Sequence, residues 1–163
     1  MDLTLDSSVI IAALRKQEAM HRECKTLLEQ VKEGRHRAFE SMIVPVEVAA
    51  AIRRRTDSER LAKQARENLL KLGSFLFLEL TELRMNSAAR IAERISLKGM
   101  DAIIAQIAEE RGSILVTLDE EFAERVDQII AVKDVGTILT EVEREQQKRS
   151  SEPTEEEGGR SRS

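Results

Sequence analysis

Short apolar runs alternate with amphipathic helical segments along most of this chain, and this alternation limits the folds that it can adopt. We predict strands at 3–5, 74–80, 113–118 and 129–132. Helical spacing of apolar residues, together with helix start and stop signals, predicts helices at 8–14, 20–32, 46–55, 57–72, 81–95, 101–108 and 120–123. Such an order favours an α/β fold, a three-layer α/β/α sandwich with a mostly parallel central sheet.

The alternating pattern covers residues 1–140, which we predict to form one domain. A chain of 163 residues with 41% hydrophobic content can bury a sizeable core, and an aromatic content of 2% makes that core aliphatic. From residue 141 the pattern fails, because the segment 141–163 is polar, lacks apolar side chains after Val142 and contains Pro153. We therefore predict a disordered tail, with a partner-binding segment as the alternative.

Composition excludes several kinds of site. The single cysteine, Cys24, rules out an internal disulfide and a cysteine-based zinc site. The two histidines, His21 and His36, lie beside arginines, which leaves little for a Ser-His-Asp triad or a histidine-rich metal site. The glycines do not form a phosphate-binding loop. The sequence has no signal peptide and no apolar stretch long enough for a membrane span, so we expect a cytoplasmic protein.

Acidic residues occur where predicted strands end and helices begin. Asp6 follows the strand at 3–5, and Asp119 follows the strand at 113–118. Glu47 lies in the first turn of the helix after the apolar run 42–44, and Asp101 opens the helix at 101–108. In an open parallel sheet, strand ends and the following helix N-termini share one edge, where ligands bind. We therefore expect these carboxylates to lie together.

Each of these carboxylates alone could simply cap a helix and satisfy its free N–H groups. Four at one edge repel each other, which raises their pKa values and costs stability unless a cation compensates. A shared divalent cation is the natural compensation. Because nitrogen and sulfur ligands are scarce, the site would be made of oxygen atoms, which suits Mg²⁺ or Mn²⁺.

The segments around these acids resemble the four acidic motifs of PIN-domain nucleases, especially VapC-type toxins. They read LDSSVII from Leu5, VPVEV from Val44, MDAIIA from Met100 and VTLDEEF from Val116, in family order. The resemblance spans about residues 2–133. It implies a small α/β/α sandwich that cleaves RNA with Mg²⁺ or Mn²⁺.

The resemblance also assigns roles to individual residues and partners. It implies that Asp6, Glu47, Asp101 and Asp119 are the catalytic and metal-binding residues. The hydroxyls of Ser8 and Thr117 would support these acids. The resemblance further implies a homodimer with a contact surface near 59–72, and inhibition by a separate antitoxin protein. Whether one or two ions act is open.

The net charge of −4 conflicts with RNA binding, which normally depends on Lys and Arg at phosphates. The acidic tail accounts for part of this charge, and a bound cation would add positive charge. Arg53, Arg54 and Arg55 are the best candidates for contacts to the RNA backbone. The alternative is a solvated helix end, where cations are favourable next to the helix dipole.

Other families with acidic sites fit less well. A phosphatase of the haloacid dehalogenase type needs an aspartate two residues after the first, where Ser8 stands. A receiver domain needs a phosphoacceptor aspartate in the middle of the chain, which Glu47 on a helix does not supply. Two alternatives stay open: a non-catalytic PIN-like scaffold or RNA-binding module, and a PIN nuclease of RNA processing that has no antitoxin. The intact set of four acids argues against the non-catalytic alternative.

Overall fold

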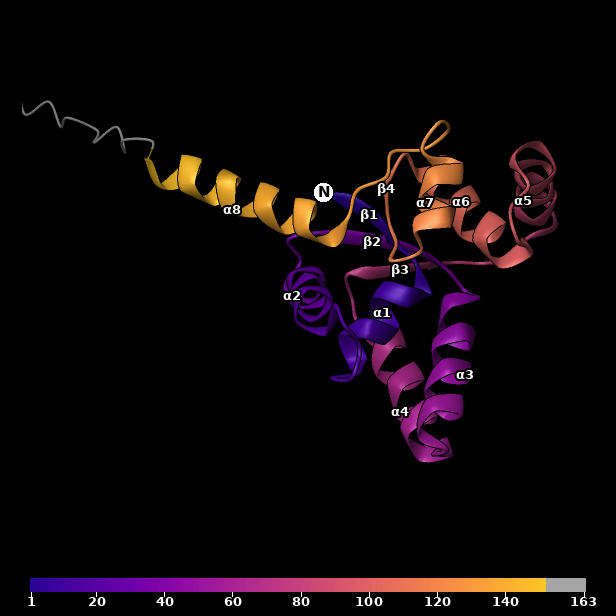
Figure 1. Ribbon diagram of the computed structural model, residues 1–163, viewed down its shortest axis with the longest axis horizontal. Helices are drawn as coiled ribbons and strands as arrows, with labels where there is room; N and C mark the ends of the chain where they lie inside the picture. The colour runs from indigo at the N-terminus through magenta and orange to yellow at the C-terminus, as the bar shows by residue number, and fades with distance from the viewer. Residues whose placement is uncertain (152–163) are drawn as a thin grey trace, which may run out of the picture.

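The computed structural model describes residues 1–151, and they form a sheet of parallel strands between two layers of helices (Figure 1). The strand order is β3-β2-β1-β4. The strands are β1 (Asp2–Leu5), β2 (Arg37–Ser41), β3 (Phe75–Leu78) and β4 (Ile114–Val116). Every pairing is parallel, as the βα alternation predicts, so the α/β prediction is confirmed.

The helices connect the strands and cover both faces of the sheet. They are α1 (Ser7–Leu14), α2 (His21–Lys32), α3 (Val44–Thr56), α4 (Glu59–Leu70), α5 (Glu82–Ile95), α6 (Gly99–Arg111), α7 (Glu120–Val126) and α8 (Val135–Ser151). In Figure 1, α1–α4 lie below the sheet and α5–α7 above it. This arrangement confirms the predicted three-layer sandwich.

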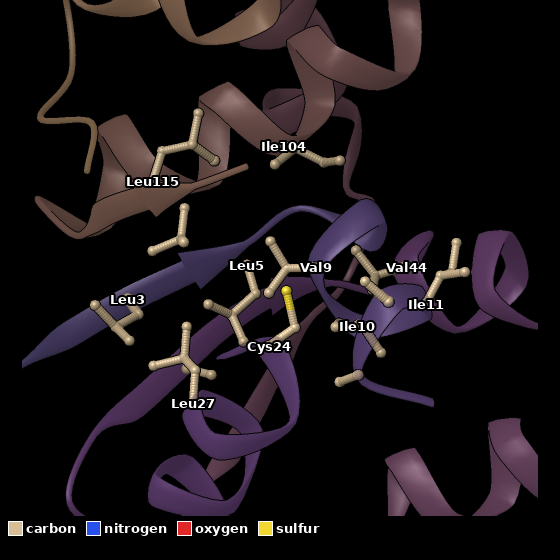
Figure 2. Packing of buried hydrophobic residues seen from close by; sticks show 14 of the residues in the cluster. Leu3, Leu5, Val9, Ile10, Ile11, Cys24, Leu27, Val44, Ile104 and Leu115 are labelled. Carbon is tan, nitrogen blue, oxygen red and sulfur yellow. The ribbon is translucent and has the colours of Figure 1, made fainter. Parts of the chain in front are cut away.

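The main core is aliphatic and is centred on β1 and α1. Leu3, Leu5 and Ile10 are completely buried, and Cys24 is buried among them. In Figure 2 the sulfur atom of Cys24 points toward Leu5 and Val9. Burial raises the pKa of the Cys24 thiol to about 11, and the neighbouring Glu23 adds to this shift, so the thiol is a structural group.

The structure contains one strand that was not predicted, and one predicted strand is present only as a single bridge. The sequence pattern did not predict β2, because Glu40 and Ser41 are polar and yet completely buried. The predicted strand at 129–132 forms only one bridge, between Leu115 and Val132. Its backbone contacts are Leu115 N–H to the Ala131 carbonyl at 2.8 Å and Lys133 N–H to the Leu115 carbonyl at 3.0 Å.

The C-terminal segment also differs from its prediction. Helix α8 continues to Ser151, so residues 141–151 are helical where the sequence indicated disorder. The reason is an apolar stripe along the first turns of α8, in which Val135, Ile138 and Val142 are buried. Lys133 Nζ also pairs with Glu141 Oε1 at 2.6 Å. The rest of the predicted tail, 152–163, lies outside the described residues, and the domain boundary at residue 140 stays a prediction.

Within residues 1–151, no helix is both long enough and apolar enough to cross a membrane.

Candidate metal centre

The predicted acidic residues all lie at the sheet edge where β1 and β4 end. Asp6 follows β1 directly and occupies the N-cap position of α1, where it is only 7% exposed. Asp119 occupies the N-cap position of α7, just after β4. Glu47 lies in the first turn of α3, and Asp101 lies in the first turn of α6. Elements distant in sequence thus place four carboxylates at one edge.

These carboxylates are close enough to affect one another electrostatically. Burial raises the pKa of Glu47, and the charges of Asp6 and Asp101 raise it further, against a hydrogen bond from Ser7. Burial also raises the pKa of Asp101, as do Asp6 and Asp119, whereas Lys98 lowers it. The structure therefore brings the predicted carboxylates close enough together for their charges to repel one another.

Asp6 is held in place through one of its two carboxylate oxygens. Oδ2 accepts hydrogen bonds from Thr117 Oγ1 at 2.8 Å and from Ser8 Oγ at 2.5 Å. Oδ1 has only a long contact of 3.5 Å with Ser7 Oγ. The Asp6 side chain is therefore fixed while one oxygen stays available for a ligand.

The same two hydroxyls also bind the backbone that follows β4. Ser8 Oγ accepts from the Leu118 N–H at 3.2 Å, and Thr117 Oγ1 accepts from the Asp119 N–H at 3.0 Å. Each hydroxyl thus donates to Asp6 and accepts from this backbone. This network fixes the end of β1 relative to the segment that carries Asp119, which is the geometry expected of groups that orient ligands.

Helix capping explains only one of the four acids. Asp119 Oδ1 accepts from the Phe122 N–H at 3.0 Å and therefore caps α7. Asp6 makes no side-chain cap bond although it stands at the N-cap position of α1. The N-cap residues of α3 and α6 are Ile43 and Lys98 rather than an acid. Helix capping therefore does not explain why acidic residues stand at Asp6, Glu47 and Asp101.

The carboxylate oxygens at this edge suit a hard divalent cation, although they are not arranged as a complete coordination shell. Glu47 Oε2 is buried without a hydrogen-bond partner, and Asp6 Oδ1 is nearly free. Both are carboxylate oxygens, which Mg²⁺ and Mn²⁺ prefer. Among residues 1–151, however, no three His, Cys, Asp or Glu side chains already form a coordination group. Binding an ion would therefore require the carboxylates to move toward it.

A further acidic residue, which sequence reasoning missed, lies beside this edge. Glu40 on β2 is completely buried, and its Oε1 accepts from the Leu5 N–H at 2.9 Å. Its Oε2 has no hydrogen-bond partner. Burial raises the pKa of Glu40 well above its ordinary value, the Leu5 N–H lowers it, and Asp6 raises it. No sequence signal identified Glu40, because β2 itself was not predicted.

The three predicted arginines have different surroundings. Arg54 and Arg55 line a hollow of about 340 Å³ beside Glu47, whose other walls include Val46 and Met100. Arg55 pairs with Glu18 at 3.6 Å. Arg53 pairs with Asp57 and does not line the hollow. Within the described part of the chain, Arg54 has no acidic partner, so its guanidinium is free to bind a phosphate.

Comparison with known proteins identifies the fold and a family. A family model described as PIN domain matches residues 3–127. No curated protein sequence matches the chain.

Several solved structures resemble this one at low sequence identity. VapBC2 from Rickettsia felis, bound to a DNA fragment from its promoter, has a TM-score of 0.62 at 13% identity, covering 82% of this chain and 98% of that chain. VapC20 of Mycobacterium tuberculosis, described as a sarcin-ricin loop cleaving toxin, has a TM-score of 0.64 at 19% identity, covering 75% and 93%. A protein of Pyrobaculum aerophilum has a TM-score of 0.65 at 20% identity, covering 88% and 96%. At these identities the likeness establishes the fold alone.

Proposed function

Because this chain belongs to the PIN domain family, we propose that it is a metal-dependent endoribonuclease and the toxin of a toxin–antitoxin pair. The observation that carries the proposal is the environment of Asp6. This residue is held by two hydroxyls and lies within electrostatic reach of Glu47 and Asp101. Three crowded carboxylates, of which capping explains none, are best accounted for by a shared cation.

Mg²⁺ or Mn²⁺ would be held by Asp6, Glu47, Asp101 and Asp119. The bound ion would lower the pKa of a water molecule and neutralise the charge that develops on the phosphate during hydrolysis. The side chains of the protein would position the reacting groups. Ser8 and Thr117 keep Asp6 oriented, and Glu47 or Asp119 would hold the attacking water.

The RNA would approach past the hollow beside Glu47. Arg54 and Arg55 line this hollow and would contact phosphates on either side of the cleaved bond. The ion pair of Arg53 with Asp57 makes it the weakest of the three candidates. Positive charge at this position offsets the repulsion between RNA and a chain of net charge −4.

Two partner proposals follow from the family and its structural relatives. The Rickettsia felis relative is a VapBC complex bound to DNA, which supports an antitoxin partner for this chain. We also propose a homodimer in which α4 contributes contacts. Leu61 and Leu70 of this helix are 38% and 41% exposed, and a second copy would cover them. Light scattering that finds only monomer over a wide concentration range would reject the dimer.

The test of the proposed function is cleavage of single-stranded RNA by the purified full chain. We expect cleavage with Mg²⁺ or Mn²⁺ and none in EDTA. Asp6→Asn should abolish cleavage, whereas the matched Asp57→Asn variant, at an exposed residue on the C-terminal end of α3, should keep it. Cleavage that survives thorough chelation, or that Asp6→Asn retains, would reject the proposal. Metal-independent RNA binding without cleavage would instead support a non-catalytic PIN-like module.

A further inference from the structure

The backbone pairing of β1 with β2 ends at Leu3, three residues before Asp6. Asp2 pairs with Arg37, and Leu3 pairs with Ala38, whereas β2 stays paired with β3 as far as Ser41. In a parallel ladder continued in this register, the Leu5 N–H would donate to the Phe39 carbonyl. The two strands instead separate at the end that carries the acidic site.

Side chains take over the hydrogen bonds that the ladder gives up. Thr4 Oγ1 donates to the Phe39 carbonyl at 2.9 Å, and the Leu5 N–H donates to Glu40 Oε1 at 2.9 Å. On its other side, β1 is held by backbone, because the Asp6 N–H donates to the Val116 carbonyl at 2.9 Å. The last residues of β1 are therefore fixed by β4 on one side and by the Glu40 carboxyl group on the other.

This use of a carboxyl group is costly, which indicates a purpose beyond filling space. Glu40 is 0% exposed, and its Oε2 has no hydrogen-bond partner. A buried polar atom without a partner destabilises the folded state, and an apolar residue would avoid that cost. An apolar residue, however, would leave the Leu5 N–H without an acceptor at the residue that precedes Asp6.

We propose that Glu40 is a positioning residue whose carboxyl group holds the Leu5 N–H and thereby fixes the point from which Asp6 reaches the cation. The inference rests on the proposed function, since it assumes that Asp6 binds Mg²⁺ or Mn²⁺. Glu40 acts through the backbone and is not itself a ligand of the ion. The role requires an acceptor oxygen at this place and does not require a negative charge.

The variants are chosen to separate the acceptor oxygen of Glu40, which the role requires, from its negative charge, which the role does not require. Glu40→Gln keeps the shape and an acceptor oxygen, whereas Glu40→Leu removes the acceptor. Thr4→Val is the matched control, because it removes the hydrogen bonds of Thr4 Oγ1 with the Phe39 carbonyl and with Ser113 Oγ and leaves the Leu5 N–H bond in place. The readouts are the dissociation constant for Mn²⁺, measured by calorimetry on the full chain without RNA, and the melting temperature.

We expect Glu40→Leu to weaken Mn²⁺ binding by about tenfold or more, as loss of a group that orients a metal ligand does. Glu40→Gln should bind Mn²⁺ like the parent, and Thr4→Val should lose stability but keep its Mn²⁺ affinity. A Glu40→Leu variant that binds Mn²⁺ as tightly as the parent would overturn the inference.

The Gln variant decides the matter if the Leu variant does not fold. Retained Mn²⁺ affinity in Glu40→Gln supports positioning through the hydrogen bond. Lost affinity in a Glu40→Gln protein that melts like the parent would overturn the inference, because the charge of Glu40 would then be needed. A parent chain that binds no Mn²⁺ would reject the proposed function and this inference together, whereas parental binding with an unaffected Leu variant would reject the inference alone.

Discussion

Thr117 Oγ1 donates a 2.8 Å hydrogen bond to Asp6 Oδ2, which joins two residues that lie 111 positions apart in the sequence. The same oxygen accepts from the Asp119 N–H at 3.0 Å. A single hydroxyl therefore links the ends of β1 and β4 and connects two of the acidic residues. We regard this link as the structural basis of a site assembled from distant segments.

Replacing Thr117 with Val should remove this link while keeping the side-chain shape. Both the Asp6 carboxylate and the Asp119 N–H lose a partner, so we expect a loss of about 1–3 kcal/mol in the free energy of unfolding. We also expect weaker Mn²⁺ binding and slower RNA cleavage. Denaturant unfolding and calorimetry measure these effects. Thr26→Val on the exposed face of α2 is the control and should change neither Mn²⁺ binding nor cleavage.

The crowding of carboxylates should also make stability depend on pH. The pKa of Glu47 is raised above 4.5 in the folded state, mainly by burial. The folded protein therefore binds its proton more tightly than the unfolded chain, and the free energy of unfolding falls as pH rises from 4.5 through the raised pKa. In EDTA, Glu47→Gln should lose this dependence, so its stability relative to the parent should increase across that window. A constant difference between the two proteins from acid to neutral pH would contradict the expectation.

Much of the fold could be predicted because the strands and helices carry regular apolar patterns. The alternation of strands and helices indicated a parallel sheet, and the positions of Asp6 and Asp119 just after apolar strands indicated a shared edge. Strand β2 could not be predicted, since it buries the polar residues Glu40 and Ser41, whose side-chain hydrogen bonds form only in the folded chain. Helix α8 was not predicted, because its apolar stripe is short and ends at Val142.

The arginine cluster shows what spacing alone leaves undecided. Consecutive residues on a helix point in different directions, and only Arg54 and Arg55 line the hollow, whereas Arg53 pairs with Asp57. The hydrogen bonds of Ser8 and Thr117 to Asp6 match the positions that the family resemblance singles out, whereas their functional role stays a prediction. Glu40 marks the limit of sequence reasoning, because its contact with Leu5 depends on where two strands separate.

Arg54 and Arg53 provide a matched pair for testing RNA contacts. Arg54→Gln should raise KM for RNA and leave kcat nearly unchanged, because a lost phosphate contact weakens binding uniformly. The slope of log binding affinity against log salt concentration should become shallower by about 0.7, the value for one contact to a single strand. Arg53→Gln, which removes a guanidinium paired with Asp57, should change KM much less. Equal effects of the two variants would show that the hollow is not on the RNA path.

Helix α8 should contribute to stability through its first turns. Ile138 is completely buried, so Ile138→Ala should cost about 2–5 kcal/mol in the free energy of unfolding. Thr140→Ala, two residues away on the exposed face, should cost much less. Denaturant unfolding compares the two variants. Equal, small losses would show that α8 is not docked on the body of the protein.

The measurement that tests the shared cation site most directly is a thermal melt of the parent and Asp101→Asn, each with Mn²⁺ and with EDTA. Mn²⁺ should raise the melting temperature of the parent, because it binds only the folded chain. Asp101→Asn should lose this increase and should melt no lower than the parent in EDTA, since it removes a charge that Asp6 and Asp119 repel. If Asp101→Asn melts lower in EDTA and keeps the full response to Mn²⁺, Asp101 stabilises only its own helix, and the four carboxylates do not form one metal site.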